Sequence, residues 1–484
     1  MRSESFPQKF VWGAASSSYQ IEGGAGAELR GASVWDRFCE QPGAIRDGSN
    51  GQTACDHYHR YREDVRLMHG LGLQAYRFSI SWPRVLPDGT GQVNEVGLDF
   101  YDRLVDTLLA NQIAPWVTLY HWDMPVELDS RGGWNNRDSA GWLAEFASVM
   151  ARRLGDRVRH WITLNEPQIF LGLGLGDGTH APGRKMPLSE RLQAAHHALL
   201  AHGDAVRALR ADCQQSGWIG WAPAVRVEYP ATDRSADVQA ARQATMAVAK
   251  RDLWNNSWFA DPIFLGCYPD DGLRLYGADA PHFENGDFER IRQPLDFLGA
   301  NIYSGSPTRA AEDGSPVIMG HPAGHARSAM NWPIAAPALR WGPRFLWERY
   351  QVPIVITENG ISSLDWVDLD GKVRDLPRID YMRRYLVELR KAVADGVDVR
   401  GYFHWSTMDN FEWAEGFKDR FGLIHVDFQT QQRTLKSSAH WYQIVIATNG
   451  EALDWPVEQA LQHQSVRERP AADGERVERP LKVR

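Results

Sequence analysis

Two glutamates stand where short, strand-like segments of this chain end. Glu166 directly follows the apolar run 160–165, and Glu358 is the last residue of the run 353–358. The Pro that follows the first and the Asn-Gly that follows the second make the chain turn, so each carboxyl group is expected to face a ligand. Two carboxyl groups brought together can cleave a glycosidic bond, one as acid/base and one as nucleophile. A single Glu at a strand end is more often a surface or salt-bridged residue. The presence of two such glutamates is what favours a catalytic role.

The elements that must position these glutamates recur along the chain. Apolar runs alternate with longer segments of helical period, and the runs are 10–19, 75–82, 114–122, 160–165, 217–224, 296–303, 353–358 and 399–405. This alternation predicts repeated βα units, and eight such units close a barrel. Because the loops after the strands of such a barrel converge on its C-terminal face, the two glutamates are predicted to share one site.

The predicted fold class is α/β, as a single (β/α)8 TIM barrel over residues 1–450. A chain of 484 residues is long for one domain, but barrels of this type accommodate long loop insertions. The segment 305–341 is weakly periodic and rich in Gly, Pro and His, which predicts an elaborated loop at the C-terminal face. Residues 451–484 are predicted to form an extension that is disordered toward its end, where the chain is charged and lacks aromatic residues.

Composition and charge argue against several classes of protein. With 43% hydrophobic and 24% charged residues, the chain can form a sizeable core. A formal net charge of -8 disfavours nucleic acid or an anionic membrane as a partner. The amino terminus has no apolar stretch that could serve as a signal peptide, and no later run reaches membrane-spanning length, so a soluble, cytoplasmic protein is expected. The 20 tryptophans exceed ordinary usage, and aromatic faces can stack on sugars.

Nothing in the sequence predicts a cofactor or a catalytic metal. The four cysteines, Cys39, Cys55, Cys213 and Cys267, are scattered without CxxC spacing, so free thiols are expected rather than a disulfide frame or a zinc site. A barrel oxidoreductase is a rival class, but no GxGxxG turn follows a strand. A small molecule is therefore the expected partner.

Four further segments make the resemblance to a known family specific. Residues 10–23 read FVWGAASSSYQIEG, residues 76–84 YRFSISWPR, residues 121–125 HWDMP and residues 409–413 DNFEW. Together with the two glutamate motifs, they resemble glycoside hydrolase family 1, the β-glucosidase family, over about residues 5–445. The resemblance implies a retaining, exo-acting enzyme that removes terminal non-reducing β-D-glucosyl residues through a covalent glycosyl-enzyme. Its expected substrates are β-glucosides and oligosaccharides such as cellobiose, with β-fucosides and β-galactosides as candidates.

The resemblance also implies a role for each matching residue. Glu358 would be the nucleophile and Glu166 the acid/base, with pKa values pushed apart by their surroundings. Arg77 and Tyr303 would hydrogen-bond the nucleophile. The implied substrate-binding residues are Gln20, His121, Trp122, Asn165, Trp405, Glu412 and Trp413, and those on the aglycone side are Phe170, Leu173 and Trp332. Amides, an imidazole and a carboxylate can pair with sugar hydroxyls, while tryptophan covers the apolar face of the ring.

Some of these residues also have a purely structural interpretation. Arg77 could form a salt bridge under the barrel mouth, and Tyr303 could be a core tyrosine. His121 could be a core histidine at a strand end, and Trp405 could fill the barrel interior. The neighbouring motif residues favour the sugar site for all four.

Glu412 bears on the choice of sugar. By resemblance, the phospho-glycosidase branch of the family carries a serine at this position, with a lysine and a tyrosine nearby. A carboxylate facing the 4- and 6-hydroxyls would repel a 6-phosphate, so unphosphorylated glucose is expected first. The alternatives are a 6-phospho-β-glucosidase and a catalytically weak sugar-binding relative, although such a relative would be expected to lack one of the two carboxylates. The sequence leaves open the aglycone, transglycosylation, product tolerance, and whether the protein is a monomer or a homo-oligomer.

Overall fold

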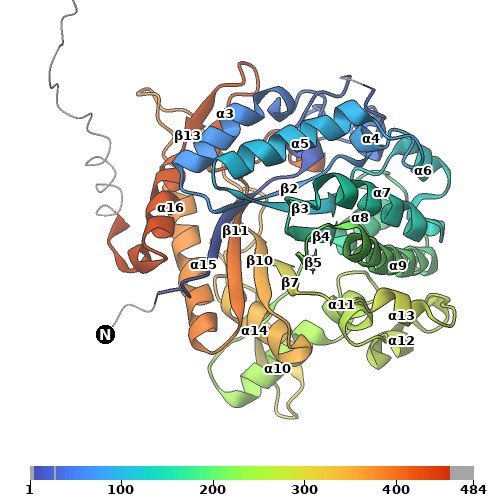
Figure 1. Cartoon of the computed structure of the whole chain (residues 1–484). Helices are drawn as coiled ribbons and strands as arrows, with labels where there is room; N and C mark the ends of the chain where they lie inside the picture. Colours follow the sequence, from blue (N-terminus) through green and yellow to red (C-terminus); the bar gives the residue numbers. More distant parts are fainter. Residues whose placement is uncertain (1–4, 27–28, 458–484) are drawn as a thin grey trace, which may run out of the picture.

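The computed structural model describes residues 5–26 and 29–457, and a closed barrel of parallel strands lies at its centre (Figure 1). The strands, in order along the chain, are β1 (Val11–Ala15), β2 (Ala75–Ser79), β3 (Ala114–Tyr120), β4 (His160–Asn165), β5 (Trp218–Ala222), β7 (Phe297–Asn301), β10 (Ile354–Asn359) and β11 (Val399–Trp405). Strand β11 pairs with β1 and closes the barrel. Each strand lies within one of the predicted runs or extends one residue past it, so the predicted (β/α)8 barrel is confirmed.

Helices surround the barrel on its outer side (Figure 1). The longer ones are α3 (His57–Gly70), α5 (Glu95–Ala110), α7 (Ser139–Leu154), α9 (Leu188–Asp212), α10 (Ser235–Met246), α11 (Asn256–Phe264), α14 (Ala338–Tyr350), α15 (Leu376–Ala394) and α16 (Ser437–Ala447). Helix α5 shows why they pack there. It buries Leu98, Tyr101, Val105 and Leu108, which recur every three or four residues and form one apolar face.

Shorter elements connect the strands and helices. The short helices are α1 (Ser18–Ile21), α2 (Val34–Cys39), α4 (Trp82–Val85), α6 (Val126–Ser130), α8 (Pro167–Gly172), α12 (Asp270–Tyr276) and α13 (Asp287–Ile291). Single 3-10 turns are η1 (Gly133–Asn135), η3 (Gly277–Asp279), η4 (Trp413–Glu415) and η5 (Glu451–Asp454), and η2 (Leu173–Asp177) is a short π-helix. A hairpin pairs β12 (Ile424–Val426) with β13 (Arg433–Leu435). None of the described helices combines the length and the apolar composition that a membrane crossing needs.

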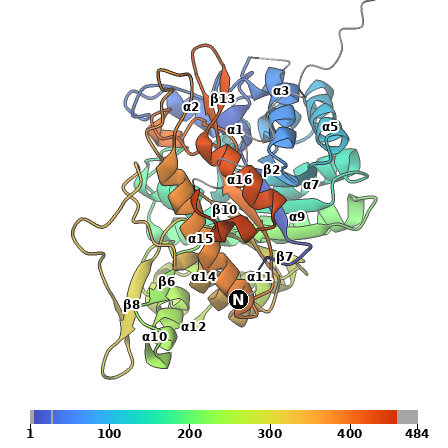
Figure 2. The same ribbon diagram turned by 90° about the vertical axis from the view of Figure 1, so that its left-hand side faces the viewer.

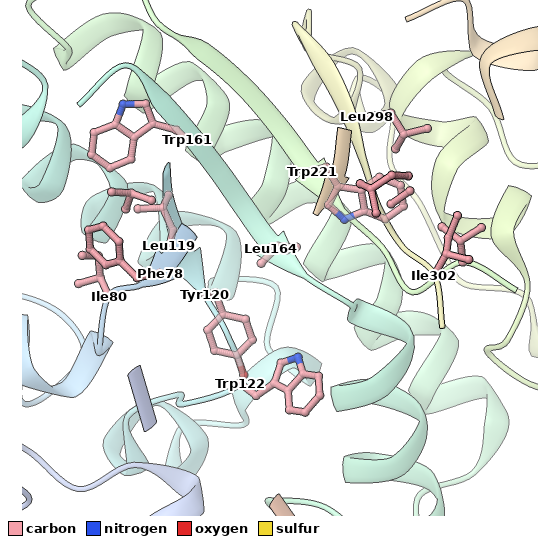
Figure 3. Packing of buried hydrophobic residues seen from close by; sticks show 14 of the residues in the cluster. Phe78, Ile80, Leu119, Tyr120, Trp122, Trp161, Leu164, Trp221, Leu298 and Ile302 are labelled. Carbon is pink, nitrogen blue, oxygen red and sulfur yellow. The ribbon is translucent and has the colours of Figure 1, made fainter. Parts of the chain in front are cut away.

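Side chains on the barrel strands alternate between the interior and the helical shell. Tyr76 and Phe78 of β2 belong to the outer apolar layer, part of which is shown in Figure 3, whereas Ala75 belongs to an inner cluster to which Trp116 and Phe403 also contribute. Because successive side chains of a strand point to opposite faces, Arg77 points into the barrel, one layer above Ala75. The same alternation that builds the core therefore places an arginine inside the barrel.

The predicted elaborated loop at 305–341 contains regular structure. Strand β8 (Ser306–Ala310) pairs in parallel with β6 (Glu228–Pro230) and antiparallel with β9 (Pro316–Ile318). Figure 2 shows β6 and β8 beside helix α10, away from the barrel strands. Strands this short carry too few residues for a recognisable period, which explains why the sequence indicated only a loop.

The packed part of the chain continues past residue 450. Turn η5 buries Ala452 and Leu453, and its Asp454 forms an ion pair of 2.7 Å with Arg390 of α15. Most of the predicted C-terminal extension, residues 458–484, lies outside the described residues.

Candidate active site

Glu166 and Glu358 line one cavity of about 790 Å³ at the end of the barrel strands. The strand pairing is irregular next to each glutamate. The register of β10 against β7 shifts between Ile356 and Glu358, and that of β4 against β5 shifts between Ile162 and Asn165. Such a shift changes the face to which the next side chain points. Val355 already points into the barrel, so strict alternation would send Glu358 outward, and the shift turns it inward.

Glu166 is held in an unusual backbone conformation. Its φ of 46° lies in the left-handed region, which costs a residue with a side chain roughly 1–3 kcal/mol. The Glu166 N–H donates to the carbonyl of Ala222 at 2.8 Å, and Pro167 then begins helix α8. Trp122 and Trp413, which line the same cavity, are also left-handed. Backbone strain of this kind is concentrated at functional sites.

Glu358 receives two strong hydrogen bonds. Arg77 Nη1 donates to its Oε1 at 2.6 Å, and the Tyr303 hydroxyl donates to its Oε2 at 2.6 Å. Arg77 is itself fixed, because its Nε donates to Thr118 and its Nη2 to Asn165. The salt bridge that was the structural alternative for Arg77 is thus made with Glu358 itself. A guanidinium group so placed favours an ionised carboxylate.

Glu166 has a different partner, Asn301, which sequence reasoning missed. The Asn301 Nδ2 donates to Glu166 Oε1 at 2.9 Å and to Asn165 Oδ1 at 3.0 Å, while its Oδ1 accepts from Thr357 at 2.6 Å. Asn301 is the last residue of β7. Its place at the C-terminal end of a barrel strand was the available signal, because functional residues of such barrels gather there.

These surroundings separate the two carboxyl groups electrostatically. Burial, together with the charge of Glu358, raises the pKa of Glu166 to about 8. Burial also raises the pKa of Glu358, but Arg77 and the Tyr303 hydroxyl oppose the increase. These surroundings therefore favour the proton on Glu166 and the negative charge on Glu358.

Aromatic rings and His121 line another part of the cavity. The His121 ring lies near those of Trp405 and Trp413, whose centroids are 5.6 and 5.9 Å from its own. Burial lowers the pKa of His121, so its neutral ring accepts a hydrogen bond from Asn165 Nδ2 at 3.1 Å. Trp405 lines the cavity and also packs in the inner apolar cluster. It can therefore both contact a sugar and fill the barrel interior.

Glu412 lines the cavity, whereas Gln20 lies behind it. The Gln20 amide donates to Asn410 Oδ1 at 3.0 Å and to Glu412 Oε2 at 3.4 Å. Burial and the nearby carboxylates of Asp419 and Glu358 raise the pKa of Glu412 well above its usual range. Asn165, which bonds to Arg77 and His121, likewise lies beneath the cavity wall.

On the predicted aglycone side, Leu173 and Trp332 line the cavity but Phe170 does not. Phe170 is buried in the core, with its ring 5.1 Å from that of Tyr120. Ile169 lines the cavity in its place. Residues 169 and 173 are four positions apart, on one side of this helical segment, whereas Phe170 is rotated from Ile169 by about 100°. The assignment of Phe170 to the aglycone side is therefore corrected to Ile169.

A further wall of the cavity comes from segments that sequence reasoning did not connect with the site. It consists of residues that follow β5 and residues of the 305–341 segment: Ala224, Val225, Arg226, Val227, Glu228, Lys250, Asp252, Trp254, Gly305, Ser306, Ile318 and Met330. No motif marks these positions. Within residues 5–26 and 29–457, no group of three or more His, Cys, Asp or Glu side chains could hold a metal ion.

A (β/α)8 barrel with one ionised and one protonated glutamate in a cavity at its C-terminal face defines the class of the glycoside hydrolases. Residues 2–451 match the family described as glycosyl hydrolase family 1, and the chain belongs to this family. It is therefore a glycosyl hydrolase.

Relatives and solved structures resemble the chain over almost its whole length. It is 42% identical over 446 residues to the 1,4-beta-D-glucan glucohydrolase of Thermotoga neapolitana, and the matched region covers 92% of this chain and 99% of that protein. It is 38% identical over 481 residues to the aryl-phospho-beta-D-glucosidase BglC of Bacillus subtilis, with 93% and 99% covered. The beta-glucosidase from Thermotoga maritima in complex with glucoimidazole has a TM-score of 0.85 at 41% identity, with 92% and 100% covered.

Proposed function

We propose that this chain is a retaining, exo-acting β-glucosidase that hydrolyses terminal non-reducing β-D-glucosyl residues. The observation that carries the proposal is the unequal setting of the two buried glutamates. Arg77 and Tyr303 both donate to Glu358, whereas the donor to Glu166 among the described residues is the neutral amide of Asn301. One carboxylate and one carboxylic acid in a shared cavity are what double displacement requires.

In the first step, Glu358 attacks the anomeric carbon and Glu166 donates its proton to the glycosidic oxygen. The bond from the anomeric carbon to that oxygen breaks, the alcohol leaves, and a glycosyl ester of Glu358 forms. The ester carries no charge, so one cause of the raised pKa of Glu166 is removed. The Glu166 carboxylate can then take a proton from the water that attacks the same carbon and releases the sugar with retained configuration.

The surroundings of Glu412 support an unphosphorylated glucose as the sugar. Its carboxyl group lies in a field of like charge from Asp419 and Glu415. The nearest lysine in sequence, Lys418, is paired with those two carboxylates at 3.1 and 3.7 Å. A 6-phosphate would therefore meet negative charge. The relatives named beta-glucosidase and 1,4-beta-D-glucan glucohydrolase support the same choice, with cellobiose as a candidate substrate.

Turnover of four nitrophenyl substrates tests the proposal: the β-glucoside, the β-galactoside, the β-fucoside and the 6-phospho-β-glucoside. The wild type is expected to cleave the β-glucoside with β-glucose as the first product by NMR, and Glu358→Ala is expected to be inactive. Cleavage of the phosphorylated substrate alone would show a 6-phospho-β-glucosidase. No cleavage of any substrate would show a sugar-binding relative.

A further inference from the structure

We propose that two stacked tyrosines of helix α15, Tyr381 and Tyr385, are positioning residues for the catalytic nucleophile. Their hydroxyl groups hold the main chain of Tyr303, and this keeps the Tyr303 hydroxyl on Glu358. The proposal rests on the β-glucosidase function proposed above and concerns the ionisation of its nucleophile. Both tyrosines are buried and neither lines the cavity, so they act through another residue and do not touch the sugar.

The main-chain carbonyl of Tyr303 accepts two hydrogen bonds from α15. The Tyr381 hydroxyl donates to it at 3.0 Å and the Tyr385 hydroxyl at 2.9 Å. The two tyrosines are four positions apart, so they share one face of the helix, and their ring centroids are 3.9 Å apart. A carbonyl oxygen has two lone pairs, and both are used here. Burial raises the pKa of each hydroxyl, so both remain protonated donors at neutral and acidic pH.

A second set of contacts ties the same main chain to the strand of the nucleophile. The Ile302 N–H donates to the Glu358 carbonyl at 3.0 Å. The side-chain amide of Asn359 donates to the Ile302 carbonyl at 2.7 Å and to the Tyr381 hydroxyl at 3.0 Å. The main chain at Ile302 and Tyr303 is thus fixed against the end of β10 on one side and against α15 on the other.

Tyr385 also joins a third segment to this point. Its hydroxyl accepts from the Ala335 N–H at 2.7 Å. Trp332, three residues earlier in the chain, packs against Tyr303, with ring centroids 5.3 Å apart. One hydroxyl group therefore holds both the main chain from which Tyr303 projects and the segment that carries a packing partner of its ring.

The position of the Tyr303 hydroxyl matters because its hydrogen bond to Glu358 is short, with the two oxygens 2.6 Å apart. The phenol oxygen lies at the far end of a rigid side chain, so a small change in the main chain displaces it further. A longer bond would stabilise the carboxylate less, and the pKa of Glu358 would rise. Arg77, Glu166 and Glu412 also interact electrostatically with Glu358, but the hydrogen bonds of the two α15 tyrosines are made with other residues.

The test follows the acidic limb of kcat/KM against pH on nitrophenyl β-glucoside, because Glu358 must be ionised to attack. Tyr303→Phe removes a hydrogen bond to a charged group and is expected to move this limb upward by about 1 pH unit. Tyr381→Phe and Tyr385→Phe weaken the same bond, and each is expected to move the limb upward by about 0.5 pH unit. When Tyr385→Phe is added to Tyr303→Phe, the limb is expected to move no further, because the bond through which Tyr385 acts is already absent.

Tyr442→Phe is the matched control, because the Tyr442 hydroxyl is also buried and donates to a main-chain carbonyl, that of Gly13, at 2.9 Å. Its acidic limb is expected to coincide with that of the wild type. Unmoved limbs in both α15 variants would overturn the proposal, as would a shift by Tyr385→Phe that is equally large with and without the Tyr303 hydroxyl.

Thermal unfolding shows whether each variant is folded. If one α15 variant does not fold, the other carries the test, and failure of both to fold would assign the pair a structural role and overturn the proposal. The proposed function fails separately: a wild type inactive on nitrophenyl β-glucoside would remove the activity itself.

Discussion

The two catalytic candidates differ in what each carboxyl group contacts. Glu358 receives a guanidinium N–H and a phenol O–H, both at 2.6 Å, while Glu166 receives one amide N–H at 2.9 Å. Both are buried, so water contributes little to stabilising either charge. The difference in donors therefore determines which carboxyl group keeps the proton. Substitution of these residues can test this assignment.

Replacement of Glu358 tests the nucleophile. Glu358→Ala is expected to lower kcat on nitrophenyl β-glucoside by roughly 10⁶-fold, the order seen when a covalent nucleophile is removed. Azide can enter the space left by the carboxylate, attack the anomeric carbon directly, and give a glucosyl azide of inverted configuration. Rate measurements with and without azide, followed by NMR of the product, check this result. A variant with substantial unaided activity would contradict the assignment.

The raised pKa of Glu166 predicts the alkaline limb of the pH profile. Glu166 must be protonated to act as the acid, so kcat/KM should fall as pH rises through about 8. In Glu166→Gln this limb should disappear, and leaving groups that need protonation should react roughly 10²–10⁴-fold more slowly. Activated aryl groups should be spared in the first step. The measurement is kcat/KM against pH for aryl and alkyl glucosides, and an unaltered alkaline limb in the variant would exclude Glu166 as the acid.

Replacement of Asn301 should move the alkaline limb of the kcat/KM profile without removing it. Its amide donates to Glu166 and so stabilises the ionised form, which lowers the pKa of that carboxyl group. In Asn301→Ala the pKa should rise, so the protonated acid persists to higher pH and the alkaline limb moves upward. Asn111→Ala serves as the control, because the Asn111 amide bonds only within its own helix end. A limb that stays in place, or moves downward, would contradict the predicted coupling.

Among the elements, the loops that follow β10 and β11 are joined by a buried ionic network. Lys436, just before α16, contacts Asp409 and Asp365 at 2.6 Å each, and Arg378 of α15 contacts Asp365 at 2.8 Å. Arg420 adds a contact of 2.7 Å to Asp409, and Arg378 also pairs with Asp375. Three acidic and three basic side chains thus balance one another. The network fixes the loop that presents Glu412 and Trp413 to the cavity.

Breaking this network should destabilise the protein strongly. Lys436→Met leaves Asp409 and Asp365 without their shared partner in a buried setting, which is expected to cost about 3–5 kcal/mol of unfolding free energy. Arg384→Met removes an exposed ion pair with Asp380 and should cost only about 0–1 kcal/mol. Urea unfolding of both variants provides the comparison. Equal effects would show that the buried network does not hold the loops.

For the molecule as a whole, the structure describes residues 5–26 and 29–457, and the family match ends at residue 451. A chain shortened to end at residue 457 is therefore expected to keep the wild-type Tm and kcat/KM. A chain that ends at residue 450 also loses the buried Leu453, a loss of about 2–5 kcal/mol for a core leucine, and its Tm should fall. Thermal unfolding and turnover of both truncations check this. A large loss in the 457 truncation would contradict it.

Local patterns in the sequence were sufficient for the barrel and for the two glutamates. Apolar period and turn residues act over a few positions, so each of the eight barrel strands could be located within its run. A Pro or Asn-Gly after a strand also marked Glu166 and Glu358 as residues at chain turns. The roles of Arg77, Tyr303 and the sugar-binding residues came from the family motifs and not from periodicity.

What local patterns could not supply is the composition of the cavity wall. The register shifts in β4 and β10, the rotation of α8 that exposes Ile169 in place of Phe170, and the position of Asn301 arise from packing between segments far apart in sequence. The further wall of the cavity, from the residues after β5 and the 305–341 segment, has the same origin, because β6 pairs with β8 across a long stretch of chain. Such contacts are set by closure of the barrel and by close packing, and no property of the individual segments specifies them.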